Sequence, residues 1–310
     1  MPPGGAPLTE AEGLLTRAET RRLVALLARH GASKVRLTGG EPALRPDLEA
    51  IAADVAGTPG VAAVGLTTNG VGLARRVAGL KAAGVSLLNV SLDTLDPDRF
   101  EAITRRRGHA SVLATLAAAR AAGLGPVKLN VVAMAGVNDD EVPGFVAYAL
   151  RAGVNVRFIE YMPFDGNAWA RARVVPYRAM LAAAQAATPG GLVRADAPGE
   201  GDPGAVAKDW VPADPARARA APGAAVSFVT SMTDAFCSTC TRVRLLADGA
   251  FKVCLFGGAE VSLRDALRGG ASDADLAALV AGALRGKAKA HAGLDVLGGL
   301  PNRAMVRIGG

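Results

Sequence analysis

Residues 34–42, Lys-Val-Arg-Leu-Thr-Gly-Gly-Glu-Pro, join a short strand to a turn that contains two glycines. Charged and apolar side chains alternate over 34–38, as in a half-buried strand. Gly39 and Gly40 then allow a tight turn and a close approach of a ligand to the backbone. Apolar residues at helical spacing precede the strand over 17–30, and Gly31 ends that helix. Helix, glycine, strand and polar turn therefore form one unit.

The same unit recurs along the first half of the chain. We expect helices over 46–56, 72–83, 109–122 and 140–151, and strands over 63–68, 85–92, 127–134 and 154–161. Alternating helices and nearly apolar strands indicate parallel βα units in a sheet that is covered on both faces or curled into a barrel. Ligands bind at the carboxyl ends of such strands. Polar residues gather there, namely Thr67, Asn69, Ser91, Asp93, Lys128, Asn130, Arg157 and Glu160.

The composition changes after residue 190. Pro, Gly, Ala and Asp dominate to about residue 223, which predicts a long connection over 191–224. A strand over 225–229, a cysteine segment, a hairpin around Asp248 and Gly249, and helices near 262–268 and 273–285 are expected to follow. We therefore expect an α/β domain over 1–190 and a small second domain over 225–310.

The chain has 310 residues, 50% hydrophobic, and a formal net charge of +7. This charge fits an anionic partner. Basic residues are scattered apart from Arg105, Arg106 and Arg107, so we expect no nucleic-acid partner. No apolar run reaches the ~18 residues of a membrane span, and 1–5 lack the features of a secretory signal. We expect a cytoplasmic protein without a membrane partner.

All three cysteines, Cys237, Cys240 and Cys254, lie close together. Their Cys-x-x-Cys spacing favours a metal or cluster site over a disulfide framework. Three thiolates suit a [4Fe–4S] cluster whose fourth iron is open to a substrate atom. Zinc would need a fourth protein ligand such as His291. A third interpretation is that the cysteines are simply small buried apolar residues.

Arg242 and Arg244 follow the second cysteine at alternate positions, so in a strand they would point the same way, beside the cluster. Guanidinium groups bind phosphate through two parallel hydrogen bonds. A solvated strand face is the ordinary alternative for these two arginines.

Four further basic residues occupy the predicted strands. Lys34 and Arg36 share one strand face, while Lys128 and Arg157 lie inside apolar strands, where an unpaired charge is costly. These residues need an anionic partner, which is either a ligand or the carboxylates of the protein itself.

Motifs along the whole chain resemble the GTP 3′,8-cyclase family of radical S-adenosylmethionine enzymes, which act first in molybdenum-cofactor biosynthesis. The resemblance is weakest over 190–223. The motifs are Thr-Gly-Gly-Glu-Pro (38–42), Thr-Thr-Asn-Gly (67–70), Asn-Val-Ser-Leu-Asp (89–93), Lys-x-Asn-x-Val (128–132), Gly-Val-Asn-Asp-Asp-Glu (136–141), Arg-Phe-Ile-Glu-Tyr-Met-Pro (157–163), Cys-x-x-Cys-Thr-Arg-x-Arg-Leu (237–245) and the closing Gly-Gly.

The resemblance implies an incomplete parallel (βα) TIM-like barrel of the radical S-adenosylmethionine type, which lacks its first strand, and a small C-terminal iron–sulfur domain. It implies a lyase that cyclises GTP to (8S)-3′,8-cyclo-7,8-dihydroguanosine 5′-triphosphate. The implied partners are GTP, S-adenosylmethionine and a downstream cyclic pyranopterin monophosphate synthase, and the implied assembly is a homodimer.

Site residues follow from the same resemblance, without a catalytic residue among them. The residues implied for S-adenosylmethionine are Gly39, Gly40, Glu41, Asn69, Ser91 and Met162. Those implied for GTP are Lys34, Arg36, Thr67, Lys128, Arg157, Arg242, Val243 and Arg244. Cys237, Cys240 and Cys254 would hold a [4Fe–4S] cluster, and Gly309 and Gly310 match a mobile tail that enters the family's active site.

One family motif is absent. A Cys-x-x-x-Cys-x-x-Cys segment holds the family's first [4Fe–4S] cluster, which cleaves S-adenosylmethionine, and Met1 to Gly5 resemble the residues that follow it. We expect a second cluster only if an upstream segment supplies this motif. Either the start is assigned too late, or the chain is a truncated, inactive relative that binds GTP and a cluster. A related radical enzyme that acts on a peptide is a third hypothesis, and the paired arginines disfavour it.

Overall fold

The computed structural model describes residues 9–195, 206–234, 237, 240–256, 258–287 and 302–308. Within these residues an eight-stranded sheet has the strand order β1-β2-β3-β4-β5-β8-β7-β6. Strands β1, β2, β3, β4, β5 and β8 pair in parallel. β7 pairs antiparallel with β8, and β6 pairs antiparallel with β7. The strands are β1 (Lys34–Leu37), β2 (Ala63–Thr68), β3 (Val85–Ser91), β4 (Val127–Ala133), β5 (Asn155–Glu160), β6 (Leu192–Arg194), β7 (Ala207–Pro212) and β8 (Ala225–Val229).

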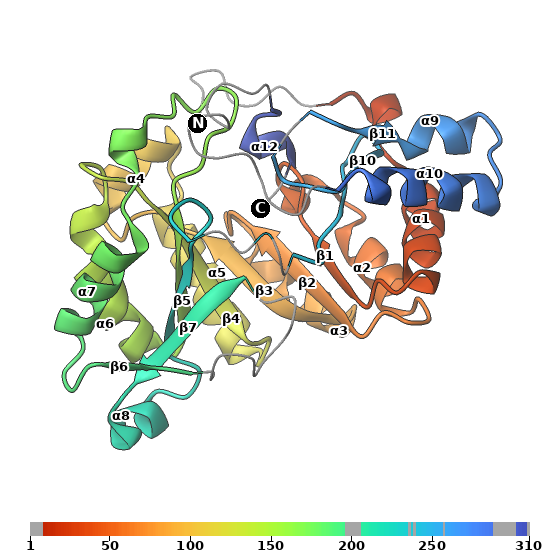
Figure 1. The fold of residues 1–310 in the computed structure, drawn as a ribbon. Helices are drawn as coiled ribbons and strands as arrows, with labels where there is room; N and C mark the ends of the chain where they lie inside the picture. The colour runs from red at the N-terminus through yellow and green to blue at the C-terminus, as the bar shows by residue number, and fades with distance from the viewer. Residues whose placement is uncertain are drawn as a thin grey trace.

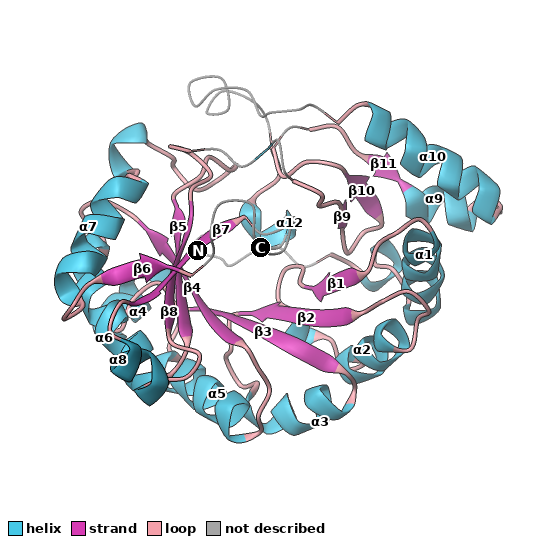
Figure 2. Ribbon diagram, turned by 60° about the horizontal axis from the view of Figure 1, so that its bottom comes forward, coloured by secondary structure: helices cyan, strands magenta, loops and turns pink. Residues whose placement is uncertain are grey.

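Helices cover the outer face of this curved sheet (Figure 2). They are α1 (Arg17–Arg29), α2 (Leu48–Ala56), α3 (Val77–Ala82), α4 (Pro97–Thr104), α5 (His109–Ala121), α6 (Val142–Ala152) and α7 (Tyr177–Ala187). The parallel strands alternate with helices as predicted, so the expected α/β fold with an incomplete parallel barrel is confirmed. None of the described helices is long and apolar enough to cross a membrane.

The main core lies between the sheet and these helices. Leu66, Leu88 and Leu129 are almost fully buried on neighbouring strands, and they pack in one cluster with the inner faces of the helices. Phe158 on β5 stacks on Phe228 of β8 with 5.8 Å between ring centroids. Such burial stabilises the fold by about 1.5–3 kcal/mol for each large apolar side chain, and it fixes the strand ends that carry the polar residues.

The segment predicted as a connection over 191–224 contains regular structure. β6, β7 and α8 (Pro215–Ala220) lie within its described part, and β7 pairs with β8. β8 itself extends the parallel sheet beside β5. In the other direction, the helix predicted over 72–83 starts only at Val77, because Gly72 has a φ of +73° and a 3-10 turn precedes the helix.

A small three-stranded antiparallel sheet follows, formed by β9 (Arg244–Leu245), β10 (Ala250–Lys252) and β11 (Val261–Ser262). Helices α9 (Leu263–Arg268) and α10 (Asp273–Arg285) come next and lie beside α1 (Figure 1). Leu23 and Leu26 of α1 join Phe251, Leu263 and Leu276 in a second apolar cluster. The C-terminal part is therefore packed directly against the first helix of the barrel.

Candidate functional site

Basic side chains from distant segments come close together at the mouth of the barrel. Burial lowers the pKa of Arg36 on β1 to about 10, and the positive charges of Arg157 on β5 and Arg242 act in the same direction. The pKa of Arg157 is itself lowered by burial and by Arg242, although Asp209 opposes the shift. Because these charges act on one another, strands β1 and β5 and the segment after Cys240 face a common space.

Lys128 on β4 belongs to the same group. Burial lowers its pKa to about 8, and Arg157, Arg36 and Lys34 contribute in the same direction, while Asp209 raises it. Lys128 lies opposite Asn89 in the sheet, and Arg157 lies opposite Asn130. The predicted cations therefore do converge, with Lys34 at the periphery.

Burial also lowers the pKa of Arg244, and Arg242 adds to this effect. The sulfur groups of Cys240 and Cys254 act on Arg244 in the opposite direction. Arg244 thus connects the group of cations to the cysteine segment, as the sequence spacing predicts.

Several buried polar atoms in this space have no hydrogen-bond partner among the described residues. They are Arg36 Nη1, Thr67 Oγ1, Asn130 Oδ1 and Arg157 Nε. No described carboxylate forms an ion pair with Arg36, Lys128, Arg157 or Arg244. Within the described residues, protein carboxylates therefore do not form ion pairs with these cations, which was the alternative to a ligand. Buried groups left unpaired in this way are suited to receiving a ligand, because each isolated polar group costs free energy.

Asp209 on β7 is the carboxylate whose charge reaches this group. Ser227 Oγ lies 2.6 Å from Asp209 Oδ1 and 2.7 Å from Asn155 Oδ1, so a hydrogen-bonded row crosses β7, β8 and β5. The sequence patterns did not indicate Asp209, because it lies in the segment predicted as a connection.

Arg36 also constrains its neighbour on β2. A Cβ atom built at Gly65 would lie 3.0 Å from Arg36 Nη1 and 3.1 Å from Arg36 Cζ. The guanidinium therefore lies against Gly65, and a side chain at this position would require it to shift by a few tenths of an ångström. Gly65 stands opposite Arg36 in the parallel pairing, which explains how the two come to touch.

The turn after β1 is held by its own glutamate. Glu41 accepts hydrogen bonds from Ala43 N (2.9 Å), Thr68 Oγ1 (2.6 Å) and Asn69 N (2.7 Å). Asn69 Oδ1 in turn accepts from Val71 N at 2.9 Å. The carboxylate of Glu41 and the side-chain oxygen of Asn69 thus stabilise the turn itself. The donors and acceptors left for a ligand are backbone groups of the turn.

The turn with Gly39 and Gly40 lies close to the C-terminal segment. Gly39 has a φ of +137°, which favours glycine. A Cβ atom at Gly40 would lie 3.4 Å from the carbonyl oxygen of Val306 in α12 (Met305–Ile308). Met162 is part of the apolar cluster that includes Ile308. Gly309 and Gly310 lie outside the described residues, as does His291.

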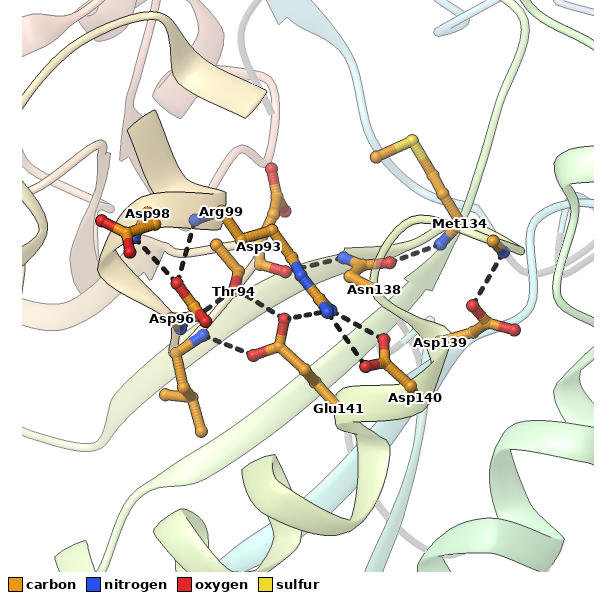
Figure 3. A network of polar contacts seen from close by, with 12 residues as sticks. Asp93, Thr94, Asp96, Asp98, Arg99, Met134, Asn138, Asp139, Asp140 and Glu141 are labelled. Carbon is orange, nitrogen blue, oxygen red and sulfur yellow. Dashed lines mark hydrogen bonds and ion pairs between the residues drawn. The ribbon is translucent and has the colours of Figure 1, made fainter. Parts of the chain in front are cut away.

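A second polar network joins the loops after β3 and β4 (Figure 3). Glu141 accepts from Thr94 Oγ1 (2.6 Å) and Leu95 N (2.7 Å) and pairs with Arg99 (2.8 Å). Asn138 Nδ2 donates to the carbonyl oxygen of Asp93 at 2.6 Å. Burial raises the pKa of the Asp93 carboxyl, whose Oδ1 accepts from Val132 N. This network fixes the loop that follows Ser91, which is exposed at the end of β3.

The three cysteines are free thiols, all partly buried. Cys240 N donates to the carbonyl oxygen of Cys237 at 3.2 Å, so these two cysteines lie close together. Lys287 Nζ donates to the carbonyl oxygens of Cys240 (2.8 Å) and Arg242 (2.9 Å) and holds the far side of the Cys-x-x-Cys loop. Within the described ranges, no group of three or more His, Cys, Asp and Glu side chains forms a site for a single metal ion.

Comparisons with protein families divide the chain into two matched parts. Residues 5–149 match the model described as "Radical SAM superfamily", and residues 154–293 match "Molybdenum Cofactor Synthesis C". Among solved structures, "Structure of TYW1 with a lysine-pyruvate adduct bound" shares 19% identity, covers 57% of this chain and 62% of that chain, and has a TM-score of 0.40. That TM-score supports no conclusion about this chain.

Curated relatives match the whole chain. "GTP 3′,8-cyclase, mitochondrial" of Arabidopsis thaliana is 44% identical over 310 residues, which is 100% of this chain and 76% of that protein. "GTP 3′,8-cyclase" of Streptomyces coelicolor is 43% identical over 318 residues, or 100% of this chain and 88% of that protein. "Molybdenum cofactor biosynthesis protein 1" of Mus musculus is 44% identical over 313 residues, and the chain spans 47% of its length.

Proposed function

The chain belongs to the GTP 3′,8-cyclase family of radical S-adenosylmethionine enzymes, and on this premise we propose that it cyclises GTP to (8S)-3′,8-cyclo-7,8-dihydroguanosine 5′-triphosphate. The observation that carries the proposal is the group of partly buried cations at the mouth of the barrel. A nucleoside triphosphate brings several negative charges, which compensate Arg36, Lys128 and Arg157 where the described carboxylates do not.

Arg242 and Arg244 complete this site from the C-terminal part. A guanidinium group donates two parallel hydrogen bonds to phosphate oxygens, so the two arginines can hold the triphosphate while Lys128 acts as a point charge. Thr67 Oγ1 and Asn130 Oδ1 are buried and have no partner in the part of the chain that the structure describes, so each offers one further hydrogen bond to a nucleotide. Lys34 and Val243 are assigned to the same site by the family resemblance.

Cys237, Cys240 and Cys254 fit an auxiliary [4Fe–4S] cluster by the chemistry of their donors. Thiolates are the ordinary ligands of such clusters, and three of them leave one iron open to bind a substrate atom. Arg244 lies close enough to Cys240 and Cys254 for these two groups to act on its charge. We propose that these cysteines place the cluster beside the purine of the bound nucleotide.

S-adenosylmethionine supplies the radical chemistry of the family when it is bound. We propose that it lies along the turn formed by Gly39, Gly40 and Glu41, with Ser91 and Met162 nearby. The residues that would hold a cluster for its cleavage are not in this chain, because residues 1–310 contain no cysteine outside 237–254. Turnover therefore requires thiolates from outside these residues.

The assembly and partners remain predictions from the family resemblance. We propose a homodimer in the cytoplasm, whose product passes to the synthase that makes cyclic pyranopterin monophosphate. Sedimentation of the purified chain would test the dimer.

Nucleotide binding is the direct test of the proposal. The chain is loaded anaerobically with iron and sulfide, its iron is counted, and GTP binding is measured by calorimetry. We expect about four irons per chain and a Kd for GTP that rises at least about tenfold in Arg244→Ala, because a buried charge-assisted contact is lost. Arg107→Ala, at a side chain that is 90% exposed, is the control and should leave GTP binding unchanged. A colourless protein, or equal GTP affinity in all three proteins, would refute the proposal.

A further inference from the structure

Glu160, the last residue of β5, is a buried carboxylate that binds none of the proposed ligands. Its side chain is completely inaccessible to solvent. One oxygen, Oε2, accepts hydrogen bonds from Met232 N (2.7 Å) and Thr233 N (2.8 Å). The other, Oε1, accepts from Tyr177 N (3.0 Å) and from the hydroxyl of Thr233. Both oxygens are thus engaged by donors from two separate segments.

These donors, rather than a cation, compensate the buried carboxylate. No described basic side chain forms an ion pair with Glu160. Backbone N–H groups are strong partners for a carboxylate, and a buried carboxylate is costly without them. The geometry therefore fixes the chain at Met232 and Thr233 onto the end of β5.

The same short segment is held from its other side. Lys208 Nζ forms an ion pair with Asp234 and lies 3.1 Å from Thr230 Oγ1, and that hydroxyl donates to the carbonyl oxygen of Asp234 at 2.7 Å. Lys208 Nζ also lies 4.7 Å from the centre of the Tyr177 ring. Residues 230–234 are consequently fixed between the carboxyl end of β5 and β7.

This fixed segment leads directly into the cysteines. Thr233 and Cys237 are four positions apart in the sequence, so an extended chain between their Cα atoms spans at most about 14 Å. Beyond the cysteines, Lys287 holds the carbonyl groups of Cys240 and Arg242. The Cys-x-x-Cys loop therefore has one anchor on each side, and Glu160 forms the anchor on the barrel.

We propose that Glu160 is a positioning residue for the cysteine segment: it sets where Cys237 and Cys240 stand relative to the barrel and so stabilises the cluster that these thiolates bind. The inference rests on the proposed function, because it requires that the cysteines hold a cluster. A glutamine at this position would turn an amide nitrogen toward at least one N–H donor, so at least one anchoring hydrogen bond would be lost.

The test compares Glu160→Gln with Glu141→Gln in the full chain. Glu141 is a matched control, because it also fixes a loop at a strand end through a backbone N–H and a hydroxyl, but it leads to no cysteine (Figure 3). After anaerobic loading, a chelator is added and loss of cluster absorbance is followed. We expect Glu160→Gln to release iron about tenfold faster than wild type and to change the electron paramagnetic resonance signal of the reduced cluster. Glu141→Gln should match the wild type in both.

Thr233→Val keeps the test usable if Glu160→Gln fails to fold. Thr233 is exposed, and the variant removes only the hydroxyl donor. We expect it to release iron about twofold to threefold faster than wild type. Unchanged release and an unchanged signal in both variants, or equal effects in Glu141→Gln, would overturn the inference while the proposed function stands. A wild-type chain that binds no cluster would instead refute the proposed function, and the inference would fall with it.

Discussion

Replacing Lys128 with methionine should stabilise the free protein and weaken its binding of GTP. The folded barrel lowers the pKa of Lys128 from its ordinary 10.5 to about 8 through burial and neighbouring cations. That difference corresponds to about 3 kcal/mol of unfavourable free energy for the charged form. Because the side chain is only partly buried, solvent screening reduces it to about 2 kcal/mol. Methionine keeps the length of the side chain and removes this cost.

The sign of the effect depends on pH in a defined way. Between the folded and unfolded pKa values, the unfolded chain binds more protons than the folded one, so stability rises with pH over that interval. The cost of Lys128 is complete below pH 8 and vanishes above pH 10.5. Lys128→Met should therefore gain most stability at pH 7, and its gain should fall by more than half near pH ~9.5.

Thermal unfolding at both pH values, with and without GTP, measures these effects. At pH 7 we expect the Tm of the free Lys128→Met variant to rise by about 4 °C, while the rise in Tm on adding GTP becomes smaller than in wild type. Lys81→Met, which alters a lysine outside the group, should show no gain. A Tm that falls at pH 7 would show that Lys128 is already compensated in the free protein. A gain that persists undiminished at the higher pH would show that it does not come from removing the charge.

Two further variants test the surroundings of the site. Gly65→Ala should weaken GTP binding several-fold in calorimetry without a large fall in Tm, because its methyl group would displace the guanidinium of Arg36; unchanged binding would show that this contact is not needed. Arg303→Ala should increase hydrogen exchange in α12, because Arg303 pairs with Asp248 and Glu260 at 2.5 Å each and so ties that segment to the small sheet. Equal exchange in wild type and variant would contradict the tether.

The parallel barrel could be predicted from sequence because each of its units repeats the same local signals. Strand β2 matches its predicted bounds, and α1 ends within one residue of its prediction, where Gly31 adopts a φ of +98°. Helix α4 was missed although its start carries a known signal. Asp96 accepts from Asp98 N and Arg99 N, and Pro97 occupies the first turn.

Long-range relations were harder to predict. The polar residues at the strand ends were indicated by their position, but their partners depend on which segments return to the barrel. Glu160 is an example, because its donors Met232 and Thr233 lie 72 and 73 residues away along the chain. Lys287 and Asp209 were not predicted as residues of the site for the same reason. No periodicity or spacing links such residues, so only the folded chain brings them together.

Elsewhere in the described chain, buried cations are neutralised by the protein. Lys252 is only 1% exposed, and its ammonium lies 3.1 Å from Glu260, which also pairs with Arg303. The barrel mouth departs from this pattern, because Arg36 and Arg157 each have a buried nitrogen that forms no hydrogen bond with the described residues. An unpaired buried charge costs free energy that an ion pair would offset. These cations therefore lower the stability of the ligand-free folded chain. A bound polyanion removes this cost, and the site is therefore organised around the charge that its ligand must bring.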